Sequence, residues 1–132
     1  MVGAGGRGVR PRWYPGRVSG QAGARELLAA DRAATLERLG GLERDFQGIV
    51  ESGSAGTDDE HDPEGATVAF ERQHVAALIG QTREHLARID AAMRRLADGS
   101  YGRCEHCGQP IGAARLAARP VATSCMGCAS RR

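Results

Sequence analysis

The stretch 104–128, CEHCGQPIGAARLAARPVATSCMGC, decides the fold because it holds all four cysteines of the chain. The cysteines form two CxxC pairs with 17 residues between them. Four cysteine thiolates are a common ligand set for structural zinc, and two CxxC turns about 15–20 residues apart can close a tetrahedron around one ion. The sequence therefore predicts one structural Zn²⁺ bound by Cys104, Cys107, Cys125 and Cys128.

Two disulfides and a redox centre are the alternative interpretations of these cysteines. The N-terminus has no apolar run of the kind that a secretory signal contains, and no stretch approaches the roughly 18 apolar residues of a membrane helix. We therefore predict a cytoplasmic protein without a membrane partner, and cytoplasmic thiols stay reduced. A redox CxxC usually lies in a strand–helix context, which this sequence lacks. Four thiolates leave zinc no open position for a substrate, so we predict no enzyme.

Composition and charge limit the rest of the chain. The 132 residues include 19 Gly and only 4% aromatic residues, which is little material for a large core. The net charge of +2 decides little, but the charges are unevenly distributed. Residues 1–24 carry Arg and no acid, whereas residues 51–64 carry six acids and no Arg. This asymmetry suggests separate surfaces with separate partners. We predict that the Gly/Arg-rich residues 1–23 are disordered.

Residues 24–98 show helical periodicity in two runs. In the first run Leu39, Leu42, Phe46 and Ile49 form one stripe, which Leu28 and Thr35 extend less well. The second run fits an a/d heptad pattern with one polar position. Its stripe consists of Val68, Val75, Ile79, Thr82, Leu86, Ile89, Met93 and Leu96.

The second run has clear start and stop signals. Asp62 is a candidate N-cap, Pro63 suits the first helical position, and the run ends before Asp98-Gly99. His74 and His85 fall off the apolar stripe, so we predict that both face solvent. The pattern as a whole indicates an all-α fold. It comprises an antiparallel coiled-coil hairpin over 24–98 with an acidic tip loop at 51–64, followed by a four-cysteine zinc finger over 99–132. Half of a four-helix bundle, built by dimerisation, is the alternative; the hairpin interpretation predicts a monomer.

The predicted loop contains the acidic segment TDDEHDPEG, 57–65. One interpretation is a solvated turn that ends in an N-cap. The other is an acidic probe at the end of a thin rod, whose carboxylates reach a metal ion or basic residues inside a narrow channel. The physics of the segment leaves both interpretations open.

From Tyr101 to Cys128 the sequence resembles the DksA/TraR family of bacterial transcription regulators, whose finger reads much like YGxCxxCGxxIGxxRLxARPxAxxCxxC. The resemblance covers roughly residues 25–130 and is most specific in the finger. Besides the cysteines, the matching residues are Tyr101, Gly102, Gly108, Ile111, Gly112, Arg115, Leu116, Ala118, Arg119, Pro120 and Ala122.

The resemblance implies a regulator that binds RNA polymerase through its secondary channel, without reading promoter DNA by sequence. In the family the acidic coiled-coil tip lies near the catalytic centre and alters initiation. The tip motif is often DxxDxA. Reading Asp59 and Asp62 as its acids puts Glu64 where Ala belongs, and these three are our candidate tip residues. An ungapped count back from the finger gives His61, Glu64 and Ala66 instead.

The resemblance also implies contacts with the alarmone ppGpp in the longer family members. Arg88 and Arg119 fall at positions that match basic residues of that site, whereas Ala129 stands where another basic residue is expected.

Two other functions compete with this interpretation. One is a nucleic-acid-binding zinc module, which would use the Arg-rich tail together with Arg115, Arg119, Arg131 and Arg132. Such binding falls steeply with salt. The spacer between the cysteine pairs shows no recognition helix, which counts against base readout. The other is a helical dimerisation module in which zinc acts as a staple.

Overall fold

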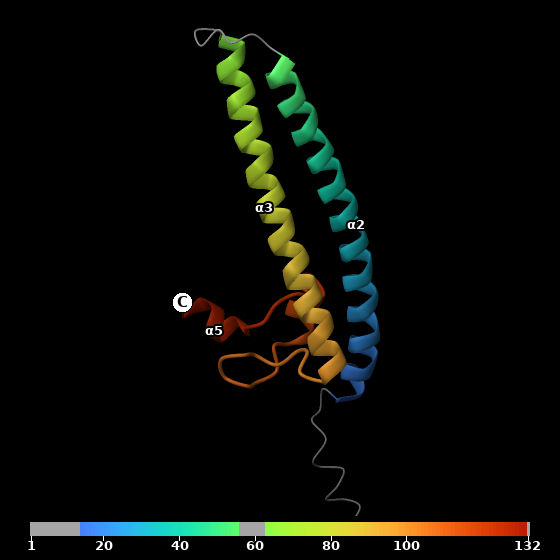
Figure 1. The fold of residues 1–132 in the computed structure, drawn as a ribbon. Coiled ribbons are helices and arrows are strands. Elements are labelled where there is room, and N and C mark those ends of the chain that lie inside the picture. Colours follow the sequence, from blue (N-terminus) through green and yellow to red (C-terminus); the bar gives the residue numbers. More distant parts are fainter. Residues whose placement is uncertain (1–13, 56–62, 132) are drawn as a thin grey trace, which may run out of the picture. The chain divides into compact units, whose positions relative to one another are not determined.

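The computed structural model describes residues 14–55 and 63–131, with side chains over 21–53 and 65–131. Within these ranges the regular elements are helices, apart from an isolated bridge between Arg103 and Pro110. Two long helices, α2 (Tyr14–Ala55) and α3 (Pro63–Asp98), precede the short helices α4 (Ala113–Ala118) and α5 (Met126–Ser130) (Figure 1). The predicted all-α fold, a helical hairpin followed by a four-cysteine cluster, is confirmed.

The chain divides into two compact units. The hairpin unit comprises Asp31–Arg88. The finger unit comprises the described residues up to Ala30 together with those from Ile89 onward. Both long helices contribute residues to each unit.

The finger unit has an apolar core in which α2 packs against the last turns of α3. Leu28 of α2 and Ile89 of α3 are fully buried, with no exposed surface. The pattern predicted a weak place for Leu28 in the stripe, yet its side chain is the most completely buried on α2. Small neighbours explain this result, because alanine side chains on both helices leave room for Leu28. The core cluster is Ala24, Leu28, Ile89, Ala92, Leu96 and Tyr101.

The hairpin unit buries little, and two of its buried residues are polar. Thr35 and Thr82 are each 6% exposed, and Ile79 is buried with them. Each threonine hydroxyl finds a partner on its own helix: Thr35 Oγ1 donates to Asp31 Oδ1 at 3.2 Å, and Thr82 Oγ1 to the carbonyl oxygen of Leu78 at 2.7 Å. These bonds satisfy the buried hydroxyls, so the two polar residues are accommodated in the seam between the helices.

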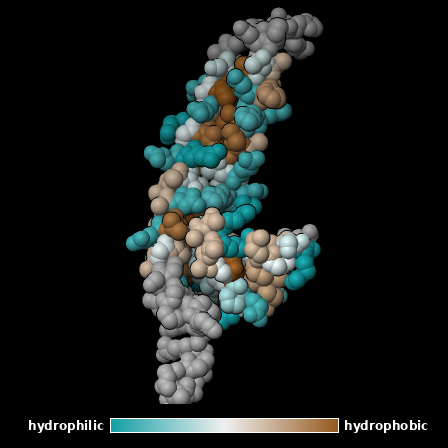
Figure 2. All heavy atoms as spheres, turned by 180° about the vertical axis from the view of Figure 1, so that it is seen from behind, coloured by the Kyte–Doolittle hydropathy of each residue, from teal (hydrophilic) through white to brown (hydrophobic). Residues whose placement is uncertain are grey.

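The rest of the predicted stripes is confirmed in this unit. On α2 the four apolar stripe residues Leu39, Leu42, Phe46 and Ile49 are half-buried. On α3 Val68, Val75 and Leu86 are half-buried as well. Apolar atoms remain at the surface beside hydrophilic ones, as the brown and teal spheres of Figure 2 show.

One ion pair and one histidine–carboxylate hydrogen bond cross from α2 to α3 within the hairpin unit. Arg83 contacts Glu43 at 2.8 Å, and the His85 ring nitrogen Nε2 lies 2.8 Å from Asp31 Oδ2. His74 is exposed as predicted, whereas the prediction for His85 holds only in part, because 38% of its side chain is exposed. Its ring is half-buried because it turns toward the carboxylate of the facing helix.

The helices also differ in extent from the prediction. α2 begins at Tyr14 and ends at Ala55, so it takes in residues 14–23, which we assigned to the tail, and residues 51–55, which we assigned to the loop. Pro15 suits the first turn of α2, where its missing N–H is not needed. Once a helix is formed and packed, each added residue extends it at a low cost in free energy. α3 begins at Pro63, as predicted. Residues 1–13 and 56–62 lie outside the described residues.

Candidate metal centre and hairpin surfaces

The four cysteines come together in the finger unit, as the sequence predicted. Their Sγ atoms all lie within 4.8 Å of one another, and the thiols are free. The sulfur atoms of Cys107 and Cys125 are 3.8 Å apart, far beyond the roughly 2.05 Å of a disulfide. A tetrahedron with Zn–S bonds of about 2.3 Å has S–S edges of about 3.8 Å. The donor set and its spacing therefore fit one structural zinc ion, and the disulfide interpretation has no support in this geometry.

Two tight turns position the sulfurs. In the first turn the N–H of Gly108 donates to the carbonyl oxygen of Cys104 at 2.9 Å, and Gly108 adopts a φ of 76° that favours glycine. In the second turn Cys125 caps the N-terminus of α5: its sulfur accepts the N–H of Cys128, and its carbonyl oxygen accepts the N–H of Ala129. Each CxxC pair is thus shaped by backbone hydrogen bonds around its first cysteine.

The spacer between the pairs forms an apolar lid beside the cysteines. Ile111 and Ala122 are buried beside Cys104 and Cys128. Leu116 of α4 packs against this cluster and also against the core of the finger unit. A hydrogen bond at 2.9 Å from the N–H of Glu105 to the carbonyl oxygen of Thr123 ties the region of one cysteine pair to the other.

Arg115 has a structural role that the sequence analysis did not identify. Its Nε donates to the carbonyl oxygen of Ser124 at 2.9 Å, and one terminal nitrogen contacts the sulfur of Met126 at 3.0 Å. The signal available in the sequence was the short distance along the chain from Arg115 to the second cysteine pair.

The thiols differ in their electrostatic surroundings. Burial raises the pKa of Cys104, but the backbone N–H groups of Cys125, Cys107 and His106 outweigh it and bring the pKa to about 6. The N–H of Cys128 lowers the pKa of Cys125. Hydrogen bonding to Cys104, together with burial, raises the pKa of Cys128 to about 12.

The other predicted site residues are less completely described. Asp59 and Asp62 lie outside the described residues, as does the side chain of Glu64, whose backbone belongs to the first turn of α3. Arg88 is exposed in the hairpin unit, 4.0 Å from Glu84. Arg119 is exposed in the finger unit, where its N–H caps the end of α4. The roles of these residues stay predictions.

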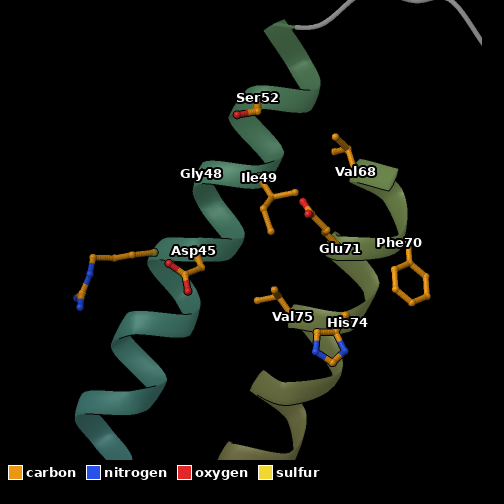
Figure 3. Close-up of a pocket in the computed structure, with 10 residues that line it drawn as sticks. Asp45, Gly48, Ile49, Ser52, Val68, Phe70, Glu71, His74 and Val75 are labelled. Carbon is orange, nitrogen blue, oxygen red and sulfur yellow. The ribbon is translucent and has the colours of Figure 1, made fainter. Parts of the chain in front are cut away.

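The hairpin unit carries an open groove between α2 and α3. The groove has a volume of ≈ 780 Å³. Figure 3 shows Ile49, Val68 and Val75 pointing into the space between the two helices, whereas Phe70 points away from it. Phe70 is 72% exposed. Charged side chains, including Arg44, Asp45 and Glu71, line the groove together with these apolar ones.

Membrane insertion receives no support from the described helices, because none of them combines the length and apolarity that a bilayer crossing requires.

Known proteins resemble this chain in the sequence of the finger and in the overall fold. Residues 99–132 match the family described as the prokaryotic dksA/traR C4-type zinc finger. The RNA polymerase-binding transcription factor DksA of Caulobacter vibrioides is 61% identical over 41 residues, which are 31% of this chain and 29% of that protein. The protein of the same name in Escherichia coli K12 is 39% identical over 62 residues, 46% of this chain and 41% of that protein. The matched stretches thus span less than half the length of these relatives.

A solved structure extends the likeness to most of the chain. The structure of transcription factor DksA2 from Pseudomonas aeruginosa matches with a TM-score of 0.74 and 31% identity, covering 86% of this chain and 82% of that one. This coverage takes in the long helices as well as the finger. With its helical hairpin, its C4 finger and this match, the chain belongs to the DksA/TraR family.

Proposed function

We propose that this chain is a non-enzymatic regulator of transcription that binds RNA polymerase in the cytoplasm. The match to transcription factor DksA2 carries the proposal, because it extends over both long helices and the finger at 31% identity. The names of the Caulobacter vibrioides and Escherichia coli relatives point to RNA polymerase as the partner. One structural zinc ion, bound by Cys104, Cys107, Cys125 and Cys128, holds the finger together.

The proposed mode of binding is insertion of the hairpin into the secondary channel of the polymerase. Asp59, Asp62 and Glu64 are the proposed tip residues, and they lie between or at the ends of α2 and α3. The groove beside Phe70 adds an apolar surface in the hairpin unit that a protein wall can cover. The tip acts by charge near the catalytic centre and makes no sequence-specific contact with DNA.

Binding to purified bacterial RNA polymerase tests this proposal. The native chain is compared with an Asp59→Asn, Asp62→Asn, Glu64→Gln variant, and a transcript-cleavage factor serves as the competitor for the channel. The matched control removes three exposed acids elsewhere on the helices, by Glu26→Gln, Glu37→Gln and Glu84→Gln. We expect the competitor to displace both the native chain and the control, and we expect the tip variant alone to lose the effect on transcription initiation.

If the native chain does not bind RNA polymerase at near-physiological salt, the polymerase proposal is contradicted. Nucleic-acid binding or self-association is then favoured. Sedimentation of the zinc-loaded chain separates the last case, because we propose a monomer, whereas a dimerisation module sediments as a stable dimer.

A response to ppGpp is the finer part of the proposal. Arg88 and Arg119 supply positive charge on exposed surfaces of the two units. If they contact the alarmone, Arg88→Ala and Arg119→Ala each reduce the additional effect of ppGpp on initiation and leave the effect of the protein alone unchanged. Equal ppGpp effects in native chain and variants contradict these two assignments.

A further inference from the structure

The sulfur atoms of the finger accept hydrogen bonds from donors of different kinds. Cys104 Sγ accepts the backbone N–H of His106 at 3.4 Å, and Cys125 Sγ accepts the backbone N–H of Cys128 at 3.4 Å. Cys128 Sγ instead accepts from the guanidinium NH2 of Arg131, also at 3.4 Å. Cys128 thus receives a donor that brings a full positive charge.

The fold holds Arg131 at this place. The residue directly follows α5 as its C-cap, and its backbone N–H donates to the carbonyl oxygen of Cys128 at 3.2 Å. One helical turn separates the two residues, so the side chain of Arg131 starts on the side of the helix where Cys128 lies. The cap uses backbone atoms, so substitution of the Arg131 side chain leaves it in place.

Other finger arginines contact oxygen or the thioether instead. Arg115 donates to the carbonyl oxygen of Ser124 and contacts the sulfur of Met126. Arg103 donates to the carbonyl oxygen of Gly108 at 2.9 Å. The hydrogen bond of Arg131 differs from these contacts because its acceptor is a cysteine sulfur.

The contact matters because a zinc ion with four thiolates carries a net charge of −2. Cys128 is 7% exposed and lies beside Ile111 and Ala122, where negative charge is poorly solvated. A guanidinium beside the sulfur offsets part of this charge, and its N–H draws electron density from the sulfur. The offset of charge favours retention of the metal, and the loss of electron density weakens the sulfur as a nucleophile.

We propose that Arg131 is a positioning residue of the zinc centre, which orients the Cys128 thiolate, slows zinc loss and shields that sulfur from electrophiles. This inference rests on the proposed zinc site. It adds to that site a residue outside the four cysteines, in the way that partners beyond the first ligands tune metal centres generally.

The test uses the full chain with Arg131→Met, which keeps side-chain length and removes the donor, and Arg131→Lys, which restores charge. Arg94→Met is the matched control, because Arg94 is exposed on α3. The first readout is zinc affinity in competition with a chelator. We expect a loss on the order of tenfold in Arg131→Met, partial rescue in Arg131→Lys and no change in the control.

Two further readouts are specific to the sulfur. In the Co²⁺-loaded chain the sulfur-to-metal charge-transfer band shifts to lower energy in Arg131→Met, because the thiolate becomes richer in electrons. With iodoacetamide on the zinc-loaded chain, peptide mass spectrometry gives the rate of labelling at Cys128 relative to Cys107. This ratio rises severalfold in Arg131→Met, and the exposed Cys107 serves as the reference within the same molecule.

Three outcomes overturn the inference. If Arg131→Met has the same zinc affinity, charge-transfer band and labelling ratio as the native chain, the contact has no effect on the metal centre. An equal change in Arg94→Met shows that net charge is responsible and not the contact. If the native chain binds neither zinc nor cobalt, the proposed zinc site itself is wrong. Metal analysis of the purified chain distinguishes this outcome from the other two.

Discussion

Tyr101 and Pro120 are joined by a hydrogen bond of 2.7 Å, from the phenolic hydroxyl to the backbone carbonyl oxygen. Tyr101 is 4% exposed and belongs to the same core as Leu28 and Ile89. Pro120 lies in the spacer between the two cysteine pairs. The bond therefore links the lid of the metal centre to the packed ends of the long helices.

Replacement of Tyr101 by Phe removes this bond and leaves a carbonyl group without its partner. We expect the zinc-loaded chain to lose about 1–3 kcal/mol in its free energy of unfolding, measured by urea denaturation. Thr123→Val is the comparison, because it removes an exposed hydroxyl bond to Glu105 of 3.2 Å and should cost less. Native stability in Tyr101→Phe would show that the bond makes no net contribution.

The ionisation of Tyr101 provides a pH test. Burial raises the pKa of its phenol above 10. A raised pKa in the folded state means that this contribution to stability is complete below pH 10 and is lost as the pH rises through the folded pKa. The chain has two Tyr, so in a Tyr14→Phe variant the phenolate absorbance reports Tyr101. A midpoint at or below 10 would contradict the buried position.

The core of the finger unit should depend on Leu28. Leu28→Ala removes a fully buried side chain, and we expect a loss of about 2–5 kcal/mol in stability. Leu27→Ala alters the neighbouring residue, which is 48% exposed, and should stay within about 0.5 kcal/mol of the native chain. Thermal and urea unfolding of the two variants compares the same chemical change inside and outside the core. Equal losses of stability would contradict the placement of Leu28 in the core.

The His85–Asp31 pair should contribute modestly to the hairpin unit. Their side chains are 38% and 37% exposed, so solvent and salt screen the interaction. A double-mutant cycle with His85→Gln and Asp31→Asn should give a coupling energy of about 0.2–1 kcal/mol that falls at high salt. A coupling energy of zero at low salt would mean that the 2.8 Å contact has no energetic effect.

Removal of zinc should affect the finger and the helices differently. Chelation under reducing conditions removes the metal from the four sulfurs and unfolds residues 99–131, while far-ultraviolet circular dichroism retains most of the helical signal of α2 and α3. Restored zinc should restore the finger. If oxidants controlled the fold and chelators did not, the zinc assignment would be wrong.

Several features of the fold were predictable because they depend on local pattern. The start of α3 at Pro63 follows from the conformation that proline prefers, and its buried stripe follows from spacing along one helix. The extent of α2 was not predictable in the same way. Glycine, serine and proline near its ends argue locally for coil, but a helix stabilised by packing elsewhere extends into such residues.

The same distinction holds for the metal centre and the seam between the helices. The sequence by itself determined the four-cysteine ligand set and the face that α3 buries, because both depend on spacings within short stretches of chain. Only the tertiary structure decided which residues from different segments of the chain are in contact. Leu28 is at the centre of a core because Ile89 packs in the same cluster, and His85 turns toward α2 because Asp31 faces it. Arg131 reaches Cys128 because it follows α5 one turn after that cysteine. Periodicity defines the face of one helix, but the identity of a residue's neighbour depends on the placement of two elements in space.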